Sequence, residues 1–408
     1  MNGKRLIVAG ATAALTAVAL LLGGVLEREG AEEAGAFTLT SRADRLDLRG
    51  SSQLQQARET GDVTYYVAAE DSFRHALRLA PGDLPATIGL GALALSRHEF
   101  RDALQLGRRA VALSPSNARG HGVVGDALLE LGRYEHAFMA FNRMVSIKPS
   151  VASYARVSYA RELLGDVRGS AEAMRYAVDA AAGQPDALAW SRTQLGKLFW
   201  AHGRPAAAER EYQAVLRVRP GYVFALEALA HVVAARGQVR RAISLARRAA
   251  DVMPLPQLVA TLGDLLHVAG EDAGARRQYA LIAVIDRLQR TNGVKTDLET
   301  ALFNVDHGVR LRQTLALARS ARADRPSIDG DDVLAWALAR NGRCGEALRF
   351  SKRALRLGTL DAPKFFHRGM IERCLGHRVE AKRWFRRALD LNPHFSLLWV
   401  PVARRYAE

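Results

Sequence analysis

The segment 366–393, FHRGMIERCLGHRVEAKRWFRRALDLNP, gathers the residue types that bind metals or nucleic acids. It holds His367, His377 and Cys374 among many arginines, and Trp384 follows one of these arginines directly. A metal site requires His, Cys or carboxylate ligands that converge. The chain has no two histidines four residues apart on one helix face and no CxxC motif. The sequence therefore predicts no metal site, no cofactor and no specific nucleic-acid partner.

Asp306 and His307 are the neighbouring residues best suited to general acid–base chemistry. Three more aspartates follow within the segment 329–332. An Asp-His pair directly before Gly308 also suits the end of a helix, and we favour that interpretation. No GxGxxG follows a predicted strand, and neither GxxxxGK[ST] nor GxSxG occurs. An enzyme centred on this pair therefore stays only as an alternative.

Prolines recur along the chain at intervals of 34, 34, 36, 35 and 34 residues: Pro81, Pro115, Pro149, Pro185, Pro220 and Pro254. A glycine lies between successive prolines, and amphipathic helical segments flank it. A period of this length indicates a solenoid of stacked helix pairs, in which each proline ends the second helix. We expect about ten units, at 47–83, 84–117, 118–150, 151–187, 189–222, 223–255, 256–293, 295–327, 328–361 and 362–395.

These units resemble the tetratricopeptide repeat. In the unit 118–150, Gly125, Gly132, Ala137 and Phe141 fall at the small, turn, small and large positions of that pattern. The small residues let the two helices approach closely, and the large residue fills the space between units. The resemblance implies an all-α, right-handed superhelical solenoid of about ten repeats. It covers residues 47–397, with a capping helix at 398–408.

In tetratricopeptide arrays the first helix of each unit lines a concave groove that binds partners. Mapped onto this chain, the groove positions are Asp126, Glu130, Tyr159, Trp190, Lys197, Glu227, His231, Asp264 and His267. They combine charges of both signs with aromatic side chains, which suits an extended peptide. The resemblance thus implies a non-catalytic scaffold that binds a protein or peptide partner.

The formal net charge of the chain is +16, and its arginines occur largely in pairs on the second helices. These pairs are Arg108 with Arg109, Arg240 with Arg241, Arg247 with Arg248, Arg276 with Arg277, and Arg386 with Arg387. We interpret them as a solvated outer face. The alternative is a surface that binds a polyanion or anionic lipid.

The only two cysteines are Cys344 and Cys374. In the repeat register, both lie beside the turn between the two helices of a unit, on neighbouring units. A disulfide that joins these units and two separate thiols both fit this placement.

The N-terminal segment has the pattern of a membrane or export signal. Lys4 and Arg5 precede residues 6–26, which carry no charge and would span roughly 30 Å as a helix. Four acids follow within 27–33. We favour an uncleaved signal-anchor over a signal peptide cleaved near Ala34–Ala36. Both alternatives place the rest of the chain outside the cytoplasm, anchored or secreted.

We therefore divide the chain into a membrane segment with an acidic linker at 1–36, a linker at 37–46 and the repeat array. The motifs NVDHG, LAWAL and LNPHF in the last third resemble those of exported bacterial tetratricopeptide proteins. On this resemblance we expect a scaffold of a bacterial cell envelope.

Overall fold

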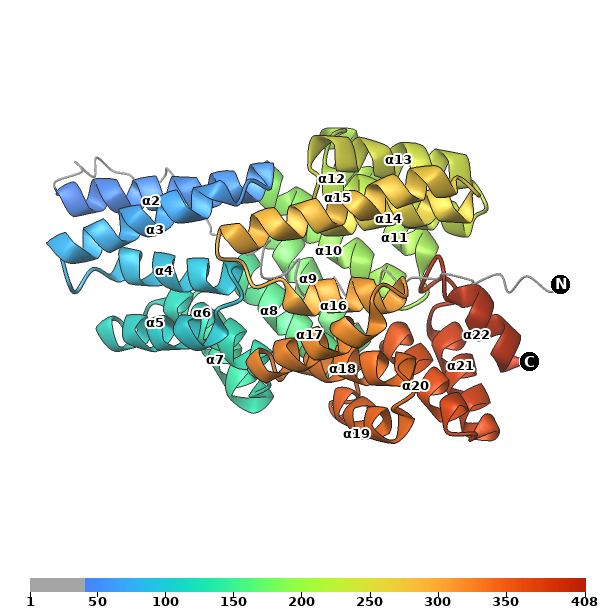
Figure 1. Ribbon diagram of the computed structural model, residues 1–408. Helices are drawn as coiled ribbons and strands as arrows, with labels where there is room; N and C mark the ends of the chain where they lie inside the picture. The colour runs from blue at the N-terminus through green and yellow to red at the C-terminus, as the bar shows by residue number, and fades with distance from the viewer. Residues whose placement is uncertain (1–40) are drawn as a thin grey trace.

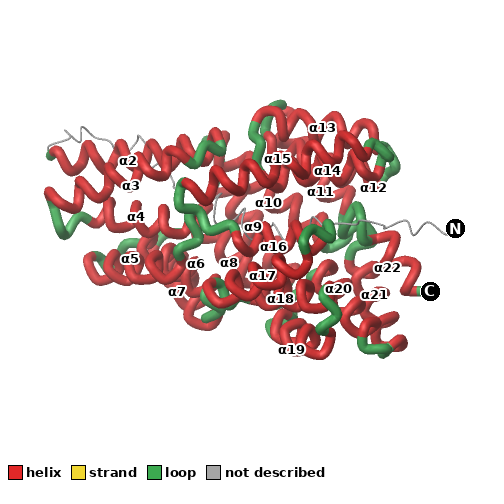
Figure 2. The backbone as a smooth tube through the Cα atoms, in the orientation of Figure 1, coloured by secondary structure: helices red, strands yellow, loops and turns green. Residues whose placement is uncertain are grey.

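The computed structural model describes residues 41–408, which form α-helices joined by short turns and contain no strand (Figure 1). Figure 2 shows how little of this range lies in loops. The helices are α2 (Arg42–Thr60), α3 (Thr64–Leu79), α4 (Leu84–Ser96), α5 (Phe100–Leu113), α6 (Ala118–Glu130), α7 (Tyr134–Ile147), α8 (Val151–Leu163), α9 (Val167–Ala180), α10 (Pro185–Ala201), α11 (Pro205–Val218), α12 (Val223–Ala235), α13 (Val239–Val252), α14 (Pro256–Val268), α15 (Asp272–Thr291), α16 (Asp297–Asp306), α17 (Leu311–Asp324), α18 (Ile328–Arg340), α19 (Cys344–Ala354), α20 (Ala362–Cys374), α21 (Arg378–Leu391) and α22 (Val400–Ala407).

Consecutive helices pack in ten pairs, from α2 with α3 to α20 with α21, and α22 packs on the last pair. The small residues explain the close pairing. Gly125 of α6 lies against the ring of Phe141 in α7, and Gly196 of α10 lies against Tyr212 in α11. A Cβ atom at either glycine would collide with the facing ring. The predicted all-α array of helix pairs is confirmed.

The array begins earlier than the sequence suggested. Ser41 and Asp44 form a reciprocal capping box, so α2 starts at Arg42, inside the segment 37–46 that we expected to be a linker. The segment 1–36, with its predicted membrane span at 6–26, lies outside the described residues. Within residues 41–408, no helix combines the length and the apolar character that a membrane span needs.

The array winds tightly enough for its second half to pack against its first. Figure 1 shows the orange and red helices α16–α21 beside the teal and green helices α6–α10. We call this contact the seam. It joins turns of the first half to the connections between later units, and its recurring hydrogen bonds link residues 192 to 197 positions apart.

The bonds of the seam recur once per unit because both halves share nearly the same repeat length. They include His98 Nδ1 to Lys295 O at 2.7 Å, Ile328 N to Tyr134 Oη at 2.6 Å, Thr359 Oγ1 to Leu163 O at 2.5 Å and Asn392 Nδ2 to Trp200 O at 2.8 Å. The carbonyls of Pro326 and Leu391 also press against Gly132 and Gly203, where there is no room for a side chain. The seam therefore brings the connections of the later units against the turns of the earlier ones.

Candidate functional site

A cavity of about 170 Å³ lies where the seam crosses the first helices of the central units. Side chains of α8, α10, α12 and α14 form one wall. The segment 359–364, which leads into α20, forms the opposite wall together with Asp329, Asn392 and Phe395. Because the two walls belong to successive turns of the superhelix, the cavity depends on a closed seam.

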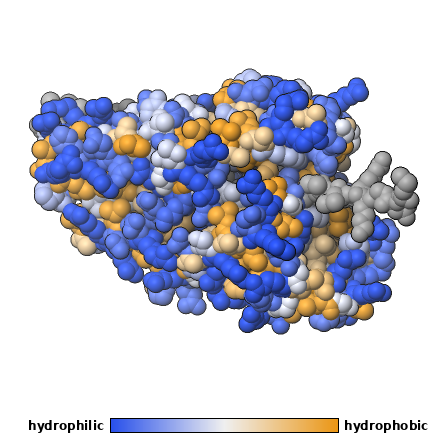
Figure 3. All heavy atoms as spheres, viewed as in Figure 1, coloured by the Kyte–Doolittle hydropathy of each residue, from blue (hydrophilic) through white to orange (hydrophobic). Residues whose placement is uncertain are grey.

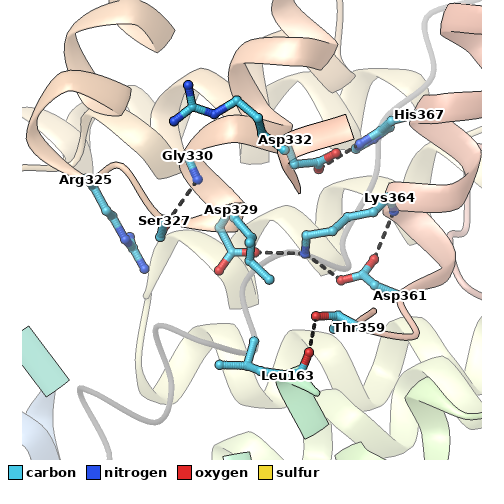
Figure 4. Close-up of polar contacts among 12 residues, drawn as sticks. Leu163, Arg325, Ser327, Asp329, Gly330, Asp332, Thr359, Asp361, Lys364 and His367 are labelled. Carbon is cyan, nitrogen blue, oxygen red and sulfur yellow. Dashed lines mark hydrogen bonds and ion pairs between the residues drawn. The ribbon is translucent and has the colours of Figure 1, made fainter. Parts of the chain in front are cut away.

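An ion-pair triad, a buried lysine between two half-buried aspartates, lies at one end of the cavity (Figure 4). Lys364 Nζ lies 2.8 Å from Asp329 Oδ1 and 2.7 Å from Asp361 Oδ2. Burial alone would lower the pKa of Lys364, but the two carboxylates raise it well above its ordinary value. Asp361 also accepts a hydrogen bond from Lys364 N at 2.9 Å and so caps α20. The triad is therefore fixed by the start of a helix.

Glu162 faces this triad from α8 and forms no ion pair within residues 41–408. Burial raises the pKa of Glu162 to about 7, with a further contribution from Asp361 that Lys364 only partly offsets. Beside it on α10, the Gln194 side chain is 7% exposed, lines the cavity and has no hydrogen-bond partner in the described chain. These two side chains leave hydrogen-bonding capacity directed at the cavity.

The other end of the cavity carries a balanced set of charges. Glu227 Oε1 lies 3.0 Å from His231 Nε2 and accepts a hydrogen bond from Thr261 Oγ1 at 3.1 Å. Burial alone would raise the pKa of Glu227, but His231 and the charge of Lys197 lower it to about 2. Glu227 is therefore ionised at neutral pH, with Lys197 as its nearby counter-charge.

Four of the nine predicted groove residues line this one cavity: Tyr159, Lys197, Glu227 and His231. All four are half-buried. They come from the first helices of three consecutive units, as the repeat register predicted. The structure therefore brings together the central part of the predicted groove.

Four other predicted groove residues are buried. Asp126 pairs with Arg156 Nη2 at 2.6 Å. Glu130 pairs with Arg325 across the seam, and Trp190 belongs to the central hydrophobic core. Asp264 accepts a hydrogen bond from Tyr279 Oη at 2.8 Å. The last predicted residue, His267, lies apart at the end of α14, with Nδ1 2.8 Å from Asp272.

The predicted Asp-His pair lies at the end of α16, but its members face different partners. Asp306 Oδ1 accepts a hydrogen bond from Trp336 Nε1 at 2.8 Å. His307 Nε2 lies 2.9 Å from Asp264 Oδ1, and its Nδ1 lies 2.8 Å from Phe303 O. Both side chains are buried, and neither lines the cavity. This arrangement fits a role in packing.

The two histidines of the opening segment have carboxylate partners that the sequence did not reveal. His367 Nδ1 lies 2.9 Å from Asp332 Oδ2, and the His367 ring stacks on Trp336. His377 Nδ1 lies 2.8 Å from Glu372 Oε2. Across residues 41–408, no three His, Cys, Asp or Glu side chains are placed to hold a metal ion.

Cys344 and Cys374 form a disulfide, with Cα atoms 6.1 Å apart. Cys344 begins α19 and Cys374 ends α20, so the bond joins the last two units beside their turns.

The ten paired arginines are all exposed. Figure 3 shows hydrophilic side chains over much of one face, with scattered apolar patches between them.

Sequence reasoning missed the wall of the cavity that the later turn supplies. Asp361 and Lys364 were not predicted as site residues, although Asp361 lies at a recognisable helix start before Pro363. That signal identifies a cap. It does not reveal which earlier helix faces the cap, because the facing helix is set by the pitch of the whole array.

The tetratricopeptide repeat family matches residues 88–152 and 193–252, which fall within α4–α8 and α10–α13. This match and the ten helix pairs of the described chain support a tetratricopeptide repeat protein. Proteins of this family generally mediate protein–protein interactions and generally act as non-catalytic scaffolds. A search of curated proteins found no match to the chain.

Several solved structures are similar to parts of the chain. One is a thermophilic tetratricopeptide repeat protein of Thermus thermophilus, with 21% identity and a TM-score of 0.39 over 46% of this chain and 98% of that chain. A tetratricopeptide repeat protein of Parabacteroides merdae has 16% identity and a TM-score of 0.43 over 60% of this chain and 99% of that chain. The pilF protein of Pseudomonas aeruginosa has 17% identity and a TM-score of 0.38 over 52% of this chain and 92% of that chain.

Proposed function

We propose that the chain is a non-catalytic scaffold that binds a protein partner through the cavity in the seam. The observation that carries this proposal is the convergence of Tyr159, Lys197, Glu227 and His231 on that cavity. The seam adds a second wall to this part of the concave surface, so a partner segment would meet a polar recess there. Mixed charges beside the aromatic ring of Tyr159 favour a peptide over a polyanion.

Partner capture tests this proposal. The full chain, a Lys197→Ala/His231→Ala variant and an Arg241→Ala/Arg248→Ala variant are cross-linked in an envelope extract, and the captured proteins are quantified. Both substituted arginines are exposed on α13, away from the cavity, so that variant is the matched control. We expect at least about a tenfold loss with the cavity variant only. Equal recovery from all three proteins would contradict the proposal.

The proposed location is a bacterial cell envelope, with the array tethered through residues 6–26 or released by cleavage. The charge-free run after Lys4 and Arg5 supports this location. The disulfide between Cys344 and Cys374 also suits an oxidising compartment. Fractionation of cells that produce the full chain, with thiol labelling of each fraction, tests it. A soluble cytoplasmic chain with reduced cysteines would contradict it.

One observation favours a second candidate, a surface that binds polyanions or anionic lipid. The ten paired arginines are exposed and the chain carries a net charge of +16. Retention on heparin that falls steeply with salt, and that weakens in the Arg241→Ala/Arg248→Ala variant, would support this candidate. Retention that is equal for both proteins would count against it.

A further inference from the structure

We propose that the cavity holds one basic side chain, lysine or arginine, of the partner segment, with its cationic group beside Glu162, Asp329 and Asp361. This inference rests on the proposed scaffold function and names the chemistry that the cavity would recognise. It concerns the end of the cavity between α8 and α20, which no predicted groove residue except Tyr159 reaches.

The charge balance at this end favours a cation. Asp329 and Asp361 share the single ammonium group of Lys364, with both oxygens within 2.8 Å of Nζ. Glu162 adds a third carboxylate that has no salt bridge in the described chain. With every group ionised, three negative charges face one ammonium, because Arg325, the other cation near Asp329, is engaged by Glu130 and Glu299. A second cation would complete this set, because charge-assisted hydrogen bonds strengthen where water is scarce.

The amide of Gln194 is a second polar group that faces the cavity. Its side chain lines the cavity and is 7% exposed, and nothing in residues 41–408 hydrogen-bonds to it. Its amide atoms are not fully buried, so they stay available to a group bound in the cavity. Gln194 belongs to α10, next to α8, so its amide can contact the group that Glu162 would hold.

The size of the cavity and its apolar lining fit one long side chain. A volume of about 170 Å³ far exceeds the roughly 10–15 Å³ that a single water molecule needs, so the cavity has room for a larger group. Leu163, Met174 and Leu360 line the cavity alongside the polar groups, and such surfaces suit an alkyl stem. Lysine and arginine are the side chains that combine a stem of this kind with a cation.

The opposite end of the cavity does not offer a better site for an anion. Lys197 is offset by Glu227, which is ionised and held by His231 and Thr261. The N-terminus of α20 is already capped by Asp361. At the Lys197 end, an acidic side chain would meet a cation that Glu227 already neutralises. At the Glu162 end, it would be repelled by the excess of carboxylates.

Fluorescently labelled pentapeptides test the inference on the full chain. The probes are Gly-Gly-Lys-Gly-Gly, its arginine equivalent and a norleucine equivalent that keeps the stem and removes the charge. We expect the lysine and arginine peptides to bind at least about tenfold more tightly than the norleucine peptide. We expect Glu162→Gln to abolish that preference, and Glu172→Gln, at an exposed position of α9, to retain it.

Equal binding of the charged and norleucine peptides, or a preference that survives Glu162→Gln, would overturn the inference. A further measurement uses 1,5-diaminopentane, a free diamine. If this diamine binds more tightly than the lysine peptide, the ligand is a free cation and the inference is overturned. If the peptides fail while partner capture still depends on Lys197 and His231, the scaffold function stands and only this inference falls. If capture shows no such dependence either, the scaffold proposal fails as well.

Discussion

Arg325 and Glu130 stand 195 positions apart in the chain and form a buried ion pair across the seam. Arg325 Nη2 donates to Glu130 Oε1 at 3.0 Å, and Arg325 Nη1 donates to Glu299 Oε1 at 2.8 Å. Burial would lower the pKa of Arg325, but the two carboxylates raise it. One guanidinium thus joins α6 to the later turn of the array, and it does so next to the cavity wall that carries Asp329.

Removing this guanidinium should open the seam. Arg325→Met leaves the buried Glu130 and the half-buried Glu299 without their cation, and we expect it to lower the free energy of unfolding by about 3–5 kcal/mol. Glu130→Gln should cost less, because Glu299 still neutralises Arg325. Urea unfolding of the full chain measures both changes. Arg101→Ala, which breaks the exposed pair with Asp324 at the same seam, should cost less than about 1 kcal/mol. Equal effects of Arg325→Met and Arg101→Ala would contradict this account of the seam.

The close approach at Gly132 gives a second test of the seam. Gly132 has a φ of +70°, and the carbonyl of Pro326 occupies the space that a side chain would need. Gly237 has a φ of +79° at the equivalent turn, and nothing lies within 4 Å of its Cβ position. Alanine at Gly237 should therefore cost only the strain of the left-handed backbone, about 1–2 kcal/mol.

Alanine at Gly132 should add about 1–3 kcal/mol to that strain, because the added methyl group collides with the backbone of the later turn. Thermal unfolding of both variants measures the difference between them. If the two substitutions lower the melting temperature equally, the seam does not form as described.

The array could be predicted from the sequence because its signals are local. Gly125 and Phe141 lie 16 positions apart in one unit, and their sizes alone indicate that they pack together. The seam could not be predicted in this way. Its position depends on small rotations between successive units, which add up over about six of them before Glu130 meets Arg325. No single residue pair encodes that sum.

The candidate site shows the same division. Lys197 and Glu227 were placed on the concave side by repeat register, and both line the cavity. Glu130 follows the same register but is buried, because Arg325 of the later turn covers it. The register fixes the direction of a side chain within its unit. It cannot say whether a later turn will cover that side chain.

The disulfide should stabilise the C-terminal end of the array. Cys344 and Cys374 are separated by 30 positions, and closing a loop of this length restricts the unfolded chain by about 3–4 kcal/mol. Cys374 is exposed, so a reductant can reach the bond. We expect reduction to lower the urea midpoint and to speed hydrogen exchange in α20–α22. A Cys344→Ser/Cys374→Ser variant should be less stable and should not respond to reductant.

Glu162 should make the stability of the array fall as pH rises. Its pKa is raised from 4.5 to about 7 in the folded chain, chiefly by burial, so between these values the folded state binds the extra proton. Stability is therefore lost progressively from about pH 4.5 to about pH 7, by at most about 3 kcal/mol.

Glu162→Gln removes this loss, so it should raise the free energy of unfolding at pH 8 and leave it nearly unchanged at pH 4.5. Urea unfolding across this range measures the effect, and Glu172→Gln at an exposed position is the control. The unfolding free energy of the variant should still fall with pH, but less steeply than that of the unsubstituted chain. The remaining fall is expected because burial also raises the pKa of Glu130 and of Asp306, each to about 6. A variant that is more stable at neutral pH and yet loses the preference for lysine peptides would separate ligand binding from folding. An unchanged slope in Glu162→Gln would show that this carboxyl is not held in an unfavourable charged state.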